Sequence, residues 1–297
     1  YTNILSPGLA YGNGVWVTLV SGTQCALVSS DDGATWKTAL LPAVTTWYKI
    51  AYVNSKFIAI GGGGAASAVF AWSSNGTDWV QASTAPASAW WQAIAYDAAI
   101  ATNKLVVIGG AATAYSGTLS TYSTDTGNVW AAGTANGVTA TWVDVASSGA
   151  GRFVQIAGGA TASTASSIST NGNTWSAGGA LASSLWQAIA YGSSKFVCIS
   201  ASAVNGPTAY SADGTSWTAS TAPSLPTGMA WVNIIFTGSV FVITSGVQAQ
   251  NYATTPGVGA FTQYCATSSD GITWSALKVL PSYTTWISAC NKSGTAV

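Results

Sequence analysis

The chain has 297 residues, of which 5% are charged, and its eight basic and eight acidic residues balance to a formal net charge of zero. So little positive charge gives no electrostatic hold on nucleic acid or on an anionic membrane, and we expect neither as a partner. Histidine is absent and all eight acidic residues are aspartate, which removes the usual base of a Ser-His-Asp hydrolase and the main ligand of common zinc and iron sites.

Cofactors and membrane insertion are not predicted either. No apolar run approaches the roughly 18 to 20 residues that cross a bilayer. The glycine run at 61–64 lacks the Lys-Ser/Thr of a phosphate-binding loop, and no calcium-loop pattern occurs, so we expect no cofactor and no metal. A surface poor in charge and rich in hydroxyls favours an extracellular or virion location. Because the chain starts at Tyr1 and its one methionine is Met229, we expect a processed product or a piece of a longer protein.

A short phrase, Ser-x-Asp/Asn-Gly-x-x-Trp, recurs along the chain at 30–36, 73–79, 123–130, 169–175, 211–217 and 268–274, with Thr126 as one inserted residue in the third copy. It predicts a tight turn, because Asp or Asn bonds nearby backbone amides and Gly accepts a positive φ. Its Trp then enters the next strand and buries a large ring. The residues predicted to shape these turns are Asp32, Asn75, Asp125, Asn171, Asp213 and Asp270.

A second signature is a tryptophan at the head of an apolar strand, as in 47–52 and 186–191. These tryptophans are Trp47, Trp91, Trp142, Trp186, Trp231 and Trp286, and subtraction gives spacings of 44, 51, 44, 45 and 55 residues. A period near 45 is typical of a β-propeller whose blades have four strands. No helical periodicity is visible, so we predict an all-β chain.

In chain order we predict one domain, 1–297, with antiparallel blades at about 6–44, 47–88, 90–139, 142–182, 186–226 and 231–282. Each blade has a strand headed by Trp, an apolar second strand, a third strand leading into the recurring turn, and a fourth strand after the turn's Trp. Residues 286–297 are predicted to close the six-bladed ring by joining the first blade. The alternative is seven blades with an incomplete last one.

The turn phrase resembles the Asp-box, Ser-x-Asp-x-Gly-x-Thr-Trp, of sialidase-type propellers and many phage tail proteins, and the match covers nearly the whole chain. A second resemblance is to the kelch repeat, because glycine pairs at 61–62, 109–110 and 158–159 each precede such a turn, although only in three of the six units. Both resemblances imply a propeller. With its Lys-Phe-x-x-Ile strands, the chain is similar to propeller repeats of phage tail fibres and related virion proteins.

Sialidase activity, which the first resemblance would imply, is excluded by composition. It would need a cluster of arginines and a glutamate partner, whereas the chain has one arginine, Arg152, and no glutamate. Other glycosidases use two carboxyl groups. Asp144 is the one aspartate on a predicted first strand, and Lys49 holds the matching place in another blade, so we interpret both as polar groups lining a wet channel. We predict that the chain is not an enzyme.

Binding is the remaining interpretation, since aromatic rings stack on the C–H faces of sugars. Insertions in repeat proteins collect on the face that binds ligands. In this chain we predict that the binding face is the one on which the first-strand tryptophans lie. The candidate ligand-binding residues are Trp47, Trp90, Trp91, Trp142, Trp186, Trp231, Trp286, Tyr252, Phe261 and Tyr264. The competing interpretation is that the first-strand tryptophans wedge between blades and that the turn tryptophans form blade core; Trp90 is then the best exposed candidate.

Two functions remain open. The first is a receptor-binding or adhesive module of a virion that recognises a host-surface glycan. The second is a structural decoration or filament subunit that contacts other virion proteins or further copies of itself. Of the cysteines, Cys25, Cys198, Cys265 and Cys290 are predicted to be buried free thiols, with a Cys25–Cys290 bridge as an alternative if the chain ends meet.

Overall fold

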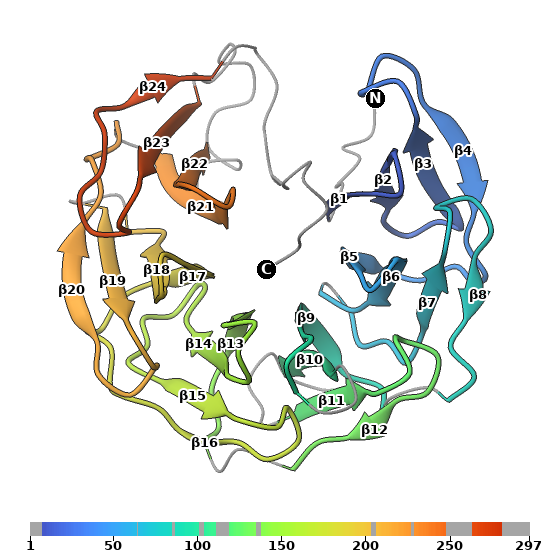
Figure 1. Ribbon diagram of the computed structural model, residues 1–297, viewed down its shortest axis with the longest axis horizontal. Coiled ribbons are helices and arrows are strands. Elements are labelled where there is room, and N and C mark those ends of the chain that lie inside the picture. Colours follow the sequence, from blue (N-terminus) through green and yellow to red (C-terminus); the bar gives the residue numbers. More distant parts are fainter. Residues whose placement is uncertain are drawn as a thin grey trace.

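The computed structural model describes residues 8–63, 65–84, 87–100, 104–110, 119–134, 138–202, 206–226, 229–247 and 263–280. Within these residues the chain forms six antiparallel four-stranded sheets and no helix. The sheets follow one another around a common axis, with the first strand of each innermost and the fourth at the rim (Figure 1). The predicted all-β, six-bladed propeller is therefore confirmed. The part predicted to close the ring, 286–297, lies outside the described residues.

The strands of the first three blades are β1 (Leu9–Gly12), β2 (Val15–Val20), β3 (Cys25–Ser29) and β4 (Lys37–Leu40); β5 (Trp47–Val53), β6 (Lys56–Gly61), β7 (Phe70–Ser73) and β8 (Val80–Gln81); and β9 (Trp90–Asp97), β10 (Lys104–Gly110), β11 (Leu119–Ser123) and β12 (Ala131–Ala132). Those of the last three are β13 (Trp142–Ser147), β14 (Phe153–Ala157), β15 (Ser166–Ser169) and β16 (Ser176–Ala177); β17 (Trp186–Gly192), β18 (Lys195–Ser200), β19 (Pro207–Ser211) and β20 (Thr218–Thr221); and β21 (Met229–Phe236), β22 (Phe241–Val247), β23 (Tyr264–Ser268) and β24 (Lys278–Val279).

Second strands form the dry centre of each blade. They are short apolar runs, and Phe57, Phe153, Phe196 and Phe241 near their starts are fully buried. Because successive side chains of a strand point to opposite faces of the sheet, such a run packs against the blade on each side. Apolar residues in continuous runs are typical of strands that are covered on both faces.

The recurring turns hold their shape through one serine and one acid or amide. In the fifth blade the Ser211 hydroxyl accepts the Gly214 amide at 2.8 Å, and the Asp213 carboxylate accepts the Thr215 amide at 2.8 Å and its hydroxyl at 2.6 Å. Gly214 has a φ of 77°, in the left-handed region that glycine occupies without strain. The predicted roles of Asn75, Asp125, Asn171, Asp213 and Asp270 are borne out by equivalent bonds.

The first turn differs from the prediction. Its serine is Ser29, whose hydroxyl accepts the Gly33 amide, and its carboxylate is Asp31, which accepts the Thr35 amide at 2.9 Å. Asp32 is instead an inserted residue with a φ of 56°, equivalent to Thr126 with a φ of 62° in the third blade. The sequence fits a turn that uses Asp31 and a turn that uses Asp32 equally well, because the two aspartates are adjacent. The sequence alone therefore does not show which carboxylate faces into the turn.

Turn tryptophans are also less uniform than predicted. Trp130 and Trp175 are buried, but Trp36 is 41% exposed, and Trp79, Trp217 and Trp274 are only partly buried. These rings sit beside the rim strands, and the fourth strands of several blades are just two residues long. Rim-strand length does not explain the difference, because the buried Trp130 and Trp175 precede two-residue strands whereas Trp36 precedes the four-residue β4. The turn tryptophans are therefore core only in part.

The cysteine prediction is right for one residue. Cys198 is a free, buried thiol, and burial raises its pKa well above the ordinary value. Cys25 and Cys265 are free but partly exposed; Cys25 is the first residue of β3 and Cys265 the second residue of β23. Cys290 lies outside the described residues.

Candidate functional site: the central cavity

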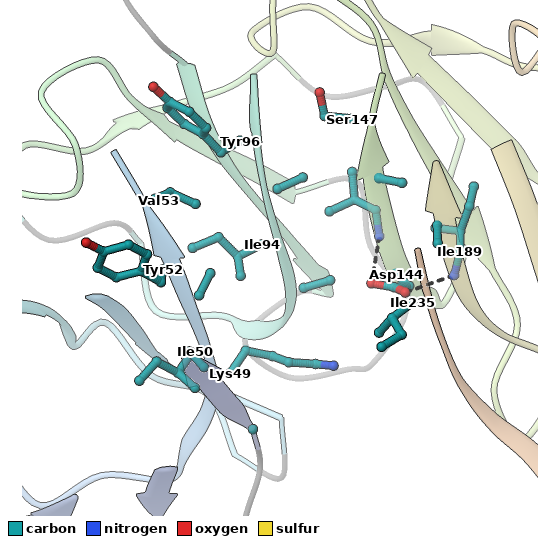
Figure 2. A pocket seen from close by; sticks show the side chains of 18 of the residues that line it. Lys49, Ile50, Tyr52, Val53, Ile94, Tyr96, Asp144, Ser147, Ile189 and Ile235 are labelled. Atoms are coloured by element: carbon teal, nitrogen blue, oxygen red, sulfur yellow. Dashed lines mark hydrogen bonds between the residues drawn. The ribbon is translucent and has the colours of Figure 1, made fainter. Parts of the chain in front are cut away.

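A cavity of about 230 Å³ lies on the propeller axis and is lined by the first strands of all six blades (Figure 2). The strands present their residues to it in layers, because in the second to sixth blades each first strand has the same register relative to its leading Trp. Nearest the Trp ends comes a polar layer, followed by branched residues such as Ile50 and Ile94. Next comes the small layer of Ala51, Ala95, Ala146 and Ala190, with Ile235 in the sixth blade. Small residues suit this layer because the first strands of all six blades converge there.

The register that forms these layers depends on a bulge. In the second to sixth blades the pairing of first and second strands shifts directly after the leading Trp, at Tyr48, Gln92, Val143, Gln187 and Val232. A bulge inserts one residue and redirects the side chains that follow. The residue two places after each Trp therefore begins a new alternation that faces the axis.

This polar layer contains three functional side chains in alternate blades. Lys49 comes from the second blade, Asp144 from the fourth and Asn233 from the sixth, while the matching positions in the blades between are Gly8, Ala93 and Ala188. All three polar residues line the cavity. Small residues between them leave the ends of the three side chains room to converge near the axis.

Asp144 is held by two backbone amides. One carboxylate oxygen accepts the Val145 amide at 3.0 Å and the other accepts the Ile189 amide of the next blade at 2.9 Å. Surrounding protein raises the pKa of this carboxyl, and the positive charge of Lys49 together with the two amides opposes that rise. Since each oxygen can accept a further bond, Asp144 retains acceptor capacity toward the cavity.

Lys49 and Asn233 differ from Asp144 in making no side-chain hydrogen bond to another described residue. Within the described part of the chain, neither side chain makes a hydrogen bond or an ion pair. Figure 2 shows the Lys49 chain extending into the cavity on the side of Asp144. The interpretation of Lys49 and Asp144 as channel-lining polar groups agrees with this placement.

Aromatic residues surround the opposite end of the first strands. Five of the six blades carry one five places after the Trp position: Tyr11, Tyr52, Tyr96, Tyr191 and Phe236. All five are partly exposed, and we call them the aromatic belt. In the fourth blade the position is Ser147, whose hydroxyl donates to Asp97 at 2.7 Å.

Some belt rings also fill space between blades. A Cβ added to Gly12 would lie 2.1 Å from the Tyr52 ring, and one added to Gly192 would lie 2.2 Å from the Phe236 ring. These two glycines thus provide the surface on which the next blade's ring rests. At the equivalent place beside Tyr96 the preceding blade has Val53, so the Tyr96 ring does not pack against a glycine of that blade.

The predicted stacking tryptophans lie elsewhere. Trp47, Trp91, Trp142, Trp186 and Trp231 are each at most 1% exposed, so their rings have no face free for a sugar. They pack between neighbouring blades, and the Trp47 and Trp186 indole nitrogens donate to backbone carbonyls four residues earlier. The structure therefore corrects their assignment as ligand-binding residues and favours the competing interpretation of wedges between blades.

The remaining aromatic candidates divide into two groups. Trp90 and Tyr264 are partly exposed, so both keep surface that a ligand could reach. Trp286, Tyr252 and Phe261 lie outside the described residues.

Sequence reasoning missed the belt, although most predicted first strands carry a Tyr or Phe five residues after their Trp. The signal that identifies the belt is its position, because a residue next to the turn at the axis cannot be covered by a neighbouring blade on all sides. The predicted binding face was the Trp end, whereas the belt lies at the other end of the cavity.

Catalytic and metal-binding groups are sparse at this site. Asp144 is the one carboxyl among the lining residues, so a pair of carboxylates for glycoside hydrolysis is not assembled there. Among the described residues no group of three or more Asp or Cys side chains lies close enough to hold a metal ion. No helix long and apolar enough to cross a membrane occurs in the same residues.

Comparison with known proteins identifies the fold alone. No family model matches the chain, and no curated protein matches its sequence. Similar solved structures include YCF48 from Cyanidioschyzon merolae, which is 12% identical, covers 93% of this chain and 86% of that one, and has a TM-score of 0.59. A catalytically inactive virginiamycin B lyase from Staphylococcus aureus with quinupristin is 10% identical over 91% of this chain and 94% of that one, with a TM-score of 0.64.

YjhT is similar to the same degree, at 10% identity over 91% of this chain and 96% of that one, with a TM-score of 0.59. These neighbours are propellers of differing function. The shared architecture accordingly leaves the function of this chain to be argued from its own site, because one fold hosts many functions.

Proposed function

We propose that this chain is a non-enzymatic binding propeller of a virion appendage, such as a tail fibre, and that it recognises a glycan on a host surface. The observation that carries the proposal is the aromatic belt around one mouth of the central cavity. Four of the five belt rings, Tyr11, Tyr52, Tyr96 and Phe236, line the cavity. Partly exposed Tyr and Phe rings offer the flat apolar faces on which sugars stack.

The charge of the site agrees with a neutral ligand. Lys49 and Asp144 are the charged residues among those lining the cavity, and they cancel. Weak binding at a single site is sufficient in an appendage, because several copies on one particle raise the avidity by orders of magnitude. An extracellular or virion location also suits a surface this poor in charge.

A glycan array tests the proposal, followed by titration calorimetry with any sugar that binds. Tyr96→Ala is the informative variant, because the Tyr96 ring lines the cavity but, unlike the Tyr52 and Phe236 rings, does not pack against a glycine of the preceding blade. We expect it to lose about fivefold or more in affinity, since one stacked aromatic contributes on the order of 1 kcal/mol. Trp90→Ala examines the Trp end of the blades, and Tyr122→Ala, whose ring lies under Lys104 outside the cavity, is the matched control.

An array without a hit, or a sugar whose affinity is equal in wild type and Tyr96→Ala, would contradict the proposal.

The second candidate function, a structural decoration or filament subunit, is favoured by one observation. Apolar side chains are exposed around the rim at Leu40 (70%), Val80 (46%), Val129 (46%) and Val279 (63%). A map of contacts in the assembled particle distinguishes the two, because it would show the rim buried against other protein in the structural role and the belt facing solvent in the binding role.

A further inference from the structure

The polar end of the cavity contains more unsatisfied hydrogen-bonding capacity than a structural role requires. Within the described part of the chain the Lys49 ammonium and the Asn233 amide donate no hydrogen bond, although the charge of Lys49 acts on Asp144. Both carboxylate oxygens of Asp144 can accept another bond. Lys49 and Asn233 are partly exposed and are not among the described buried groups that lack a partner, so water in the cavity can solvate them until a ligand displaces it. Three such groups from three alternate blades converge on one cavity.

The chemistry of the three groups is complementary to a particular ligand. Lys49 offers only donors and a positive charge, so it fits a carboxylate. Asp144 offers only acceptors and a negative charge, so it fits an ammonium group. Asn233 supplies both donor and acceptor. A molecule that carries a carboxylate and an ammonium group on the same carbon would satisfy Lys49 and Asp144 together without adding net charge to the cavity.

The walls next to this layer are apolar. Ile50, Ile94, Val145, Ile189 and Ile234 follow directly along the first strands, and the alanine layer comes after them. These side chains would surround an aliphatic group but offer it no hydrogen bond. At about 230 Å³, the cavity has room for several water molecules or one small ligand.

We infer that the polar end of the central cavity binds a small apolar α-amino acid, with its carboxylate on Lys49, its ammonium group on Asp144 and its side chain among the branched residues. Asn233 hydrogen-bonds the carboxylate from the third side. This site is separate from glycan stacking at the aromatic belt and does not depend on it. Binding of an amino acid without any glycan hit would leave this inference standing alone.

The test is titration calorimetry of the full chain with L-leucine and with two analogues that each lack one charge. 4-Methylpentanoate lacks the ammonium group and 3-methylbutylamine lacks the carboxylate. We expect L-leucine to bind and each analogue to bind at least about tenfold more weakly, because each leaves one charged group of the site unpaired. Equal binding of L-leucine and either analogue would overturn the inference, as would the absence of any L-leucine binding to the folded protein.

Variants then assign each charge. Lys49→Met should weaken L-leucine at least about tenfold and leave 3-methylbutylamine unchanged; Asp144→Asn should weaken L-leucine and strengthen 4-methylpentanoate. Lys56→Met is the matched control, since Lys56 belongs to the same hairpin but lies 4.2 Å over the Trp72 ring, away from the cavity. Because Asp144 also joins two blades, Lys49→Met is the primary variant, and an unchanged L-leucine affinity in its folded form would contradict the inference.

Discussion

The turn carboxylates are exposed groups whose ionised form is preferred by the fold. Hydrogen bonds from the Thr215 hydroxyl and amide lower the pKa of Asp213 to about 2, and the amides of Thr273 and Ile272 lower that of Asp270 to about 2. A carboxylate that accepts such bonds loses them on protonation, so its charge is coupled to the shape of the turn. Asn75 and Asn171 form the same turn with an amide that does not titrate.

This difference predicts a pH dependence. Because the pKa of Asp213 is lower in the folded state, its contribution to the free energy of unfolding is complete above the unfolded pKa of about 4 and is lost as the pH falls toward 2. Asp213→Asn should therefore reduce the loss of stability between pH of about 4 and 2, measured by urea denaturation. The change should be under about 1 kcal/mol, because solvent screens the exposed group.

The reciprocal variant is the control for that measurement. Asn171→Asp places a carboxylate in an amide turn and should make stability steeper over the same pH range. Equal slopes for wild type and both variants would show that these turns do not couple proton binding to folding.

Burial separates the tryptophans of this chain by location. Trp186 is 1% exposed between two blades, whereas Trp36 is 41% exposed at the rim. We expect Trp186→Ala to lower the free energy of unfolding by about 3 to 5 kcal/mol, since it leaves a large cavity. Trp36→Ala should cost about 1 kcal/mol or less. Urea denaturation of the pair measures this, and similar costs would mean that Trp186 does not wedge the blades apart.

At the scale of the strand pair, the glycine of five of the six turns fits against the second strand of the preceding blade. Cβ atoms added to Gly76, Gly127, Gly172, Gly214 and Gly271 would lie 2.4 to 2.7 Å from a branched side chain there. The side chains they meet, Val17, Ile58, Val106, Val154 and Val197, are fully buried. The glycine is thus required twice, once by its positive φ and once by the approach of its neighbour.

The two requirements can be separated by mutation. Gly33 and Gly214 have similar φ values of 86° and 77°, but a Cβ on Gly33 would meet only its own Trp36 among the described residues, whereas one on Gly214 would lie 2.7 Å from Val154. Gly33→Ala should cost about 1 to 2 kcal/mol from the backbone alone. Gly214→Ala should cost about 1 to 3 kcal/mol more through overpacking. Equal losses in urea denaturation would show that the contact at Gly214 relaxes freely, or that Gly33 is covered in the same way.

At the scale of the whole molecule, the propeller was predictable because its two signatures are periodic and local. The turn phrase predicts a tight turn and the Trp-headed run predicts a strand, each from local sequence alone. A repeat period near 45 residues is then compatible with few repeat architectures. The site was less predictable for the same reason. Whether Trp91 faces a ligand or a neighbouring blade depends on the bulge at Gln92 and on how the sheets pack, and neither is a property of the local sequence.

Departures from the repeat show the same limit at particular positions. Asp97 occupies a place where other blades have Gly12, Val53 or Gly192, and the sequence gives no reason for a carboxylate there. The structure supplies one, because Asp97 is fully buried and joins the third blade to the fourth. One of its oxygens accepts the Ser147 hydroxyl at 2.7 Å and the Gly151 amide at 2.9 Å, and the other accepts the Ala99 amide at 2.9 Å.

Asp97 should therefore contribute to the stability of the contact between the third and fourth blades. Asp97→Ala would leave the Ser147 hydroxyl and the Gly151 amide without their acceptor, and each such loss in the interior costs about 1 to 3 kcal/mol. We expect the free energy of unfolding to fall by about 3 kcal/mol or more, with faster hydrogen exchange at Gly151 ahead of global unfolding. Asp78→Ala, which removes an exposed carboxylate that accepts one bond from Asn75, is the control and should change stability by about 1 kcal/mol or less. If the two variants were equally stable, the blades would be held together by apolar packing alone, and the polar contact between the third and fourth blades would add nothing to it.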